Sequence, residues 1–200
     1  MDNKQQTTKG RWKLLLVLAV CASPMIFSYL SYYVIKPEGR TNYGTILDPR
    51  QYPIPDLQSH RLGDAPSSAQ TGLRDYAGKW LLVTISSADC DAACEKRLHD
   101  LRQLRLAQGK EMERVERVWL LTDQAPVETR LLREYDGMRV LQVDRARLAA
   151  WLPVAADTTL SEHIYVIDPL GNLMMRYPKN ADPNKIKKDI SKLLRASAIG

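Results

Sequence analysis

The chain has 200 residues, of which 44% are hydrophobic and 26% charged, and its formal net charge at pH 7 is +6. This length accommodates one globular domain with accessory segments. The three cysteines are too few for a disulfide scaffold. Basic residues near the C-terminus have the spacing expected on the solvent-exposed face of an amphipathic helix, so the net charge gives no support for nucleic-acid binding.

The first predicted element is a transmembrane helix at residues 14–35. This stretch has no charged side chain and is long enough to cross a hydrocarbon core of about 30 Å. Trp12 precedes it and a group of tyrosines ends it, as is typical of membrane interfaces. Basic side chains are denser before the stretch than after it, which predicts a cytoplasmic tail at 1–13 and export of the remainder. A cleaved signal peptide is the alternative, but its apolar run is normally shorter and ends at a small-x-small site.

Residues 36–70 are predicted to be a periplasmic linker or irregular arm. Prolines and glycines recur throughout this segment, and its apolar residues follow no sustained period. The folded domain is therefore expected at 71–200. With the anchor before it, the domain would lie on the periplasmic side of a bacterial inner membrane, and only the anchor would contact lipid.

Strands and helices are predicted to alternate in this domain. An apolar strand at 80–85 is followed by a helix from Cys90 to about Ala107, with leucines at helical spacing. The later elements are a strand at 115–121, a helix at 126–135, a strand at 140–143, a helix at 145–151, a hairpin of strands 164–167 and 173–176, and a helix from 183 to about 195. This order predicts an α/β thioredoxin-like fold, a central mixed sheet flanked by helices.

Cys90 and Cys94 lie where the first strand gives way to the first helix. We expect Asp89 to cap this helix and the two cysteines to lie one turn apart on one helix face. The positive end of the helix dipole favours thiolates, whereas nearby acidic side chains oppose them. Thiolates are the nucleophiles of disulfide exchange and soft ligands for Cu(I). The spacing therefore predicts a redox pair, a metal site or both; a structural disulfide is the alternative.

Asp123 ends the strand at 115–121. Its expected role is to cap the helix that begins at Pro126. The alternative is an acid close to the cysteines, because strand ends converge on one edge of an open sheet.

Several motifs carry a resemblance to a known family. They are the lead-in Gly72–Trp80, the C-x-x-x-C motif of Cys90 and Cys94, the segment Trp119–Asp123 followed by Pro126, and His163 with the turn Asp168–Gly171. Over roughly residues 72–195, the chain resembles the Sco/SenC family of cytochrome c oxidase assembly proteins. The resemblance implies a membrane-anchored periplasmic protein that binds copper, Cu(I) or Cu(II), through Cys90, Cys94 and His163. It also implies a role in building the binuclear copper centre of the oxidase.

The chain departs from the family pattern at two places. Asp91 and Glu95 stand where family members usually or often carry proline after each cysteine. The family histidine generally lies further upstream of the hairpin turn than His163 does. Because side chains alternate along a strand, an odd offset points the imidazole to the other face of the sheet.

Three functions remain open from the sequence. The first is a copper metallochaperone or assembly factor, with the copper-bearing oxidase subunit or another assembly factor as partner. The second is a thiol–disulfide reductase acting on a partner's copper-ligating cysteines, in which Cys90 attacks and Cys94 resolves. The third is a docking module without chemistry. An assembly factor is expected more than a true enzyme.

Overall fold

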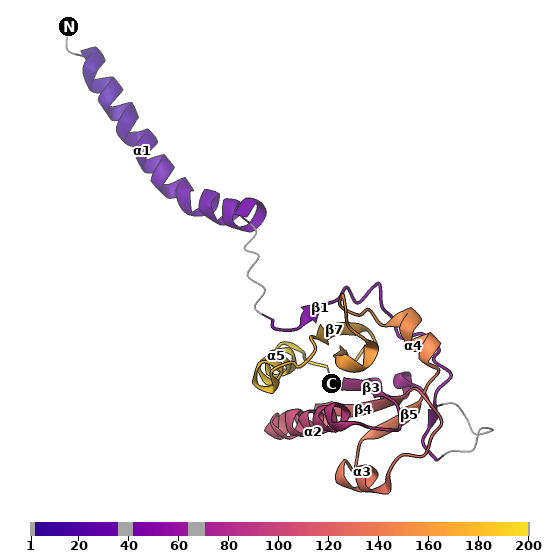
Figure 1. The fold of residues 1–200 in the computed structure, drawn as a ribbon. Coiled ribbons are helices and arrows are strands. Elements are labelled where there is room, and N and C mark those ends of the chain that lie inside the picture. The colour runs from indigo at the N-terminus through magenta and orange to yellow at the C-terminus, as the bar shows by residue number, and fades with distance from the viewer. Residues whose placement is uncertain (1–2, 36–41, 64–70, 200) are drawn as a thin grey trace. The chain divides into compact units, whose positions relative to one another are not determined.

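The computed structural model describes residues 3–35, 42–63 and 71–199, and it divides into the units Met1–Thr41 and Asn42–Gly200. The first unit is the helix α1 (Asn3–Tyr29) followed by a π-helical turn, η1 (Leu30–Ile35) (Figure 1). Its stretch Arg11–Tyr29 has a mean hydropathy of 1.6 and is long enough to cross a membrane. The predicted spanning helix is present, although the helix already begins within the predicted tail.

A proline lies inside this apolar helix. Pro24 has no N–H to donate, so the carbonyl of Val20 loses its helical partner. The hydroxyl of Ser23 donates to this carbonyl at 2.8 Å. A side chain therefore satisfies the carbonyl that the proline leaves unpaired, as apolar surroundings demand.

The second unit is a seven-stranded mixed sheet with the order β1-β7-β6-β3-β4-β5-β2 (Figure 1). Strands β3, β4 and β5 run parallel. On the other side of β3, β6 pairs antiparallel to β3, and β7 pairs antiparallel to β6. The strands are β1 (Thr45–Ile46), β2 (His60–Arg61), β3 (Trp80–Ser86), β4 (Val115–Leu121), β5 (Arg139–Gln142), β6 (Ile164–Ile167) and β7 (Leu173–Tyr177). The α-helices are α2 (Ala92–Leu106), α3 (Thr129–Glu134), α4 (Arg145–Trp151) and α5 (Pro183–Ala196), with short helical turns η2 (Leu73–Tyr76), η3 (Gly109–Arg114) and η4 (Leu160–Glu162).

Helices cover both faces of the sheet. On one face, Leu82 of β3 and its neighbours pack against Leu101 of α2 and Ile190 of α5. On the other face, Val83 packs with Leu148 of α4. Alternate residues of the fully buried β3 thus serve two cores, which explains why its sequence is a continuous apolar run. The predicted thioredoxin-like architecture is confirmed.

The arm before the first long strand differs from the predicted linker. Its described part, 42–63, contributes β1 and β2, which pair with β7 and β5 at opposite ends of the sheet. Ile54 and Leu57, each 3% exposed, belong to the core. The compact unit therefore begins at Asn42 and not at residue 71. The segments 36–41 and 64–70 of the predicted linker lie outside the described residues.

Hydrogen bonds to α5 hold the start of the arm in place. The buried carboxylate of Asp189 accepts the amide N–H groups of Tyr43 and Gly44, at 2.8 and 2.9 Å. Irregular backbone needs such side-chain partners because it has no ladder of its own. Sequence periodicity carries no signal for bonds of this kind.

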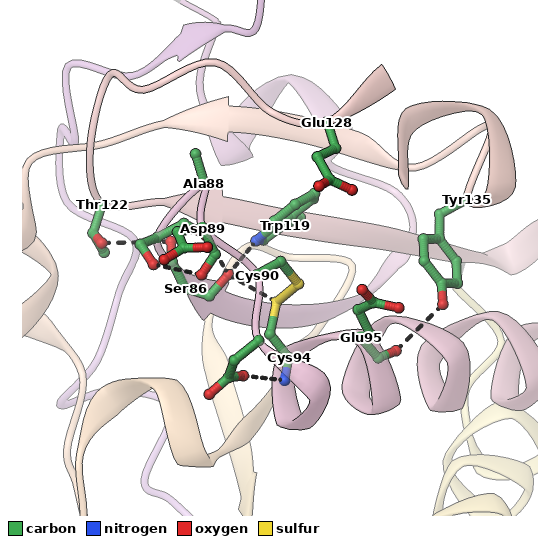
Figure 2. Close-up of a disulfide and its surroundings, with 12 residues drawn as sticks. Ser86, Ala88, Asp89, Cys90, Cys94, Glu95, Trp119, Thr122, Glu128 and Tyr135 are labelled. Atoms are coloured by element: carbon green, nitrogen blue, oxygen red, sulfur yellow. Dashed lines mark hydrogen bonds between the residues drawn. A yellow bond between two sulfur atoms is a disulfide. The ribbon is translucent and has the colours of Figure 1, made fainter. Parts of the chain in front are cut away.

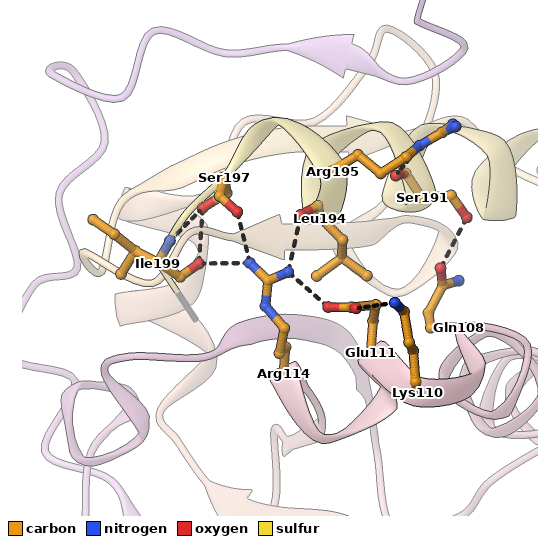
Figure 3. A network of polar contacts seen from close by, with 9 residues as sticks. All are labelled: Gln108, Lys110, Glu111, Arg114, Ser191, Leu194, Arg195, Ser197 and Ile199. Carbon is orange, nitrogen blue, oxygen red and sulfur yellow. Dashed lines mark hydrogen bonds and ion pairs between the residues drawn. The ribbon is translucent and has the colours of Figure 1, made fainter.

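The end of α5 is fixed to η3 by one arginine (Figure 3). Arg114 donates from Nη1 to the carbonyl of Leu194 at 2.9 Å and to Glu111 at 2.8 Å. Its Nη2 donates to the carbonyls of Ser197 and Ile199. The guanidinium therefore caps the carbonyl end of α5, where positive charge is favourable. The lysines of α5 are exposed, as predicted for the wet face of an amphipathic helix.

Candidate redox site

A disulfide joins Cys90 and Cys94 at the junction of β3 and α2, with their Cα atoms 5.2 Å apart (Figure 2). Cys94 is 3% exposed, whereas Cys90 is half-buried. The two residues therefore differ in exposure, and Cys90 is the more accessible of the pair.

The helix begins later than predicted, and a different aspartate caps it. The N-cap of α2 is Asp91, whose carboxylate accepts the N–H of Cys94 at 2.8 Å. Asp89 precedes Cys90 in a turn where the Cys90 N–H donates to the carbonyl of Ala88. Cys90 consequently lies outside the helix instead of one turn before Cys94 within it. Because Cys90 is not held at the spacing of one helical turn, its Cα lies 5.2 Å from that of Cys94, a usual distance for a disulfide.

Asp123 supports the turn that carries Cys90, and the predicted capping role for it is wrong. Its two carboxylate oxygens accept the N–H of Ala88 at 3.1 and 3.2 Å. The helix that it was expected to cap, α3, begins only at Thr129 with Glu128 as N-cap. The residues from Pro126 to Glu128 are irregular, and Val127 packs against the apolar cluster around the disulfide. The alternative, an acid near the cysteines, is the observed arrangement.

Two polar side chains that the sequence did not indicate lie beneath the disulfide. Ser86 Oγ is 3.2 Å from Cys94 Sγ, and it accepts the indole N–H of Trp119 at 2.7 Å (Figure 2). Ser86 ends β3 and Trp119 lies on β4, so parallel pairing brings them together. The available signal was a serine that ends a mostly apolar strand, on the side that faces α2, four residues before Cys90.

The acidic side chain that follows Cys94 is neutralised by an ion pair. Glu95 accepts from Arg130 of α3 at 2.6 Å, and this contact raises the pKa of the Arg130 guanidinium. Two further carboxylates, Glu128 and Glu134, lie 3.4 Å from the same guanidinium. The pairing reduces the repulsion that Glu95 alone would exert on a thiolate at Cys94.

The structure does not bring His163 to the cysteines. Its Nδ1 is 2.8 Å from the carbonyl oxygen of Tyr177, and its Nε2 is 2.7 Å from the hydroxyl of Thr158. The side chain is fully buried, and burial lowers the pKa of this imidazole, against the opposing effect of the Tyr177 carbonyl. The ring packs edge-on against Tyr165, which belongs to the core on the face away from α2. The expectation that an odd offset turns the imidazole to the other face therefore holds.

A three-ligand metal site is not assembled among the described residues. No group of three or more His, Cys, Asp or Glu side chains there is placed to hold a metal ion. The reduced cysteine pair would offer two thiolates. Because both nitrogens of His163 already have hydrogen-bond partners, this side chain supplies no third ligand in the observed arrangement.

Comparisons with known families place this site in context. Residues 80–197 match a family model described as the transmembrane-like, thioredoxin-like C-terminal domain, and residues 4–34 match the transmembrane-like N-terminal domain. The comparison with curated proteins found no match.

Solved structures share the fold at low identity. A putative electron transfer protein from Aquifex aeolicus is 16% identical with a TM-score of 0.53, covering 74% of this chain and 95% of that one. A thiol:disulfide interchange protein from Bacteroides sp. is 16% identical with a TM-score of 0.52, covering 74% and 91%. Yeast Sco1 is 16% identical with a TM-score of 0.50, covering 62% and 85%. The resemblance to Sco proteins is confirmed as a likeness of fold.

Proposed function

The chain belongs to the transmembrane-like, thioredoxin-like family, and from this premise we propose that it is a membrane-anchored thiol–disulfide exchange protein. The observation that carries the proposal is the disulfide between a half-buried Cys90 and a buried Cys94 at the β3–α2 junction. An accessible sulfur paired with a protected one is the arrangement that disulfide exchange requires.

The proposed exchange runs in two balanced steps. In the reduced protein the Cys90 thiolate attacks one sulfur of a partner's disulfide, which forms a mixed disulfide and releases the partner's other sulfur as a thiolate. The Cys94 thiolate then attacks Cys90 Sγ, restores the Cys90–Cys94 bond and releases the second partner thiol. Two electrons pass to the partner, and a membrane-bound dithiol donor must return the protein to its reduced form.

The half-buried position of Cys90 suits the first step and the burial of Cys94 the second. A buried resolving thiol meets no solvent oxidant before the mixed disulfide forms, and it lies next to the sulfur that it must attack. The turn held by Asp123 keeps Cys90 in place during both steps. Partner cysteines that ligate copper in an oxidase are the proposed substrates, in keeping with the Sco/SenC resemblance.

The anchor fits this role. α1 is a single-pass membrane anchor by length, composition and family match. In the proposal, basic residues at the start of the chain keep the N-terminus in the cytoplasm, and the domain lies in the periplasm of a bacterium. Disulfide chemistry operates in that compartment.

Trapping the mixed disulfide tests the proposal. Cys94→Ser leaves Cys90 able to attack but removes the resolving thiol, so a partner should stay covalently attached. Cys90→Ser is the matched control and should trap far less, because Cys94 is buried. Equal trapping by both variants, or none by either, would contradict the assigned roles.

Copper handling in cytochrome c oxidase assembly is a second candidate function. The fold shared with yeast Sco1 and the cysteine pair at the first strand–helix junction favour it. Soft thiolates select Cu(I), so the reduced pair has suitable donors. His163 does not fit as a third ligand, because Tyr177 and Thr158 engage its ring.

Titration of Cu(I) into the reduced fragment 42–200, against a chromophoric chelator, tests this second candidate. It predicts one-to-one binding that is lost in Cys90→Ser and in Cys94→Ser but kept in His163→Ala. No binding by the reduced fragment would exclude the copper function and leave exchange, or docking without chemistry, to explain the protein.

A further inference from the structure

Ser86 lies at the point where the buried sulfur of the disulfide meets the sheet. Its Oγ contacts three groups: the indole N–H of Trp119 at 2.7 Å, the carbonyl oxygen of Ser87 at 3.0 Å and Cys94 Sγ at 3.2 Å. Ser86, Cys94 and Trp119 are all buried residues, with exposed fractions of 8%, 3% and 1%. Water therefore has little access to this sulfur.

The hydrogen-bonding capacity of each group fixes the roles. An indole N–H only donates, so Trp119 occupies one lone pair of Ser86 Oγ. The single hydroxyl proton of Ser86 then has two acceptors within reach, the Ser87 carbonyl and Cys94 Sγ. A disulfide sulfur is a weak acceptor and a thiolate is a strong one. When the disulfide opens, rotation about Cβ–Oγ transfers this bond from the carbonyl to the sulfur without moving a proton off the serine.

We propose that Ser86 is a positioning residue that stabilises the Cys94 thiolate, with Trp119 orienting its hydroxyl. The inference rests on the proposed exchange function and deepens it. A thiolate in a dry apolar site is unfavourable unless a donor meets it. The amide of Cys94 does not serve, because its N–H is committed to Asp91. The hydroxyl of Ser86 supplies the donor instead, and Trp119 strengthens it by polarising the O–H bond.

This donor matters in both directions of exchange. When a partner thiolate attacks Cys90, the Cys94 thiolate is the leaving group, and a stabilised thiolate leaves faster. When Cys94 resolves the mixed disulfide, a larger thiolate fraction is available for the attack. Loss of the hydroxyl should therefore slow both steps.

The direct test is the ionisation midpoint of the Cys94 thiol. The full chain in detergent carries Cys21→Ser and Cys90→Ser, so that Cys94 is the sole thiol, and thiolate absorbance near 240 nm is followed against pH. Ser86→Ala should raise the midpoint by about one unit or more, a tenfold fall in thiolate at a fixed lower pH, because a hydrogen bond to a charged group is lost. Trp119→Phe should raise it less, and Ser86→Thr, which keeps the hydroxyl, should restore it.

A matched control separates this role from general destabilisation. Ser59 is also buried, and its hydroxyl donates to the carbonyl of Thr71 instead of to a cysteine. Ser59→Ala should leave the Cys94 midpoint unchanged. An unchanged midpoint in Ser86→Ala, or an equal shift in Ser59→Ala, would overturn the inference.

A second measurement follows the rate of reduction. With both cysteines present, dithiothreitol should reduce the disulfide of Ser86→Ala more slowly than that of the wild type.

The midpoint and the trapping experiment together distinguish this inference from the proposed function. A shifted midpoint in a protein that traps no partner would reject the exchange function while retaining the role of Ser86. Partner trapping with an unshifted midpoint would do the reverse.

Discussion

Asp123→Ala removes the acceptor that holds the turn before Cys90. In the structure both carboxylate oxygens of Asp123 accept the N–H of Ala88, a residue that is 4% exposed. Alanine offers no replacement, so a buried amide loses its partner. The perturbation acts on the turn that carries the accessible cysteine and leaves the disulfide itself unchanged.

The expected cost follows from this amide. Leaving a buried donor unsatisfied costs about 1–3 kcal/mol. Asp123 is half-buried, so water can reach part of the vacated space, and we expect the lower part of that range. With a urea dependence of about 2 kcal/mol per molar, the midpoint of unfolding should fall by roughly 0.5–1 M.

Urea unfolding of the oxidised fragment 42–200, followed by tryptophan fluorescence, measures the effect. Asp123→Asn is the matched control: it keeps one carbonyl oxygen as acceptor and should retain most of the stability. If Asp123→Ala unfolds at the wild-type midpoint, the hydrogen bond to Ala88 does not hold the turn. If the Asn and Ala variants fall equally, charge and not the acceptor is responsible.

Three further predictions concern the core, the buried imidazole and the anchor. Gly44→Ala should destabilise the domain by about 1–3 kcal/mol in thermal unfolding, because the new Cβ would lie 2.5 Å from Met175 Sδ, and an unchanged midpoint would refute the close packing. Burial lowers the pKa of His163, so the unfolded state takes up its proton first, and this contribution to stability is present above about pH 6.5 and lost as pH falls below it. Urea midpoints at pH 7.5 and 5.5 should show this loss in the wild type and a smaller loss in His163→Gln; equal losses would exclude the imidazole as the cause. Alkaline phosphatase fused to the C-terminus should be active and β-galactosidase inactive if the domain is periplasmic, and the reverse pattern would contradict the orientation.

The sequence predicted the elements whose residues carry a strong period or run. β4, α4 and β6 have the predicted bounds, because each is a buried run or an amphipathic turn closed by clear breaks. α2 and α3 begin later than predicted. The start of α2 follows from a local cap, because Asp91 and not Asp89 accepts the amide N–H of Cys94. Val127, just before α3, packs against the cluster around the disulfide, a tertiary contact that local propensity does not contain.

The candidate site was partly predictable for the same reason. Cys90 and Cys94 stood out because a strand–helix junction and two thiols are visible in one short stretch. Asp123 was visible as a strand end, but its choice of Ala88 over the next helix depends on tertiary structure. Ser86 and Trp119 meet only through the pairing of β3 with β4, so no short stretch of sequence contains their contact.

The reduction potential of the Cys90–Cys94 disulfide tests the central claim most directly. The protein is equilibrated in dithiol buffers of graded potential, quenched with acid, and its free thiols are counted by alkylation and mass spectrometry. If the protein exchanges disulfides, we expect its disulfide to be reduced in one two-electron transition, with a reduction potential in the range of thiol–disulfide oxidoreductases, about −120 to −270 mV. A disulfide that stays oxidised below about −300 mV would behave as a structural bond and would contradict the account.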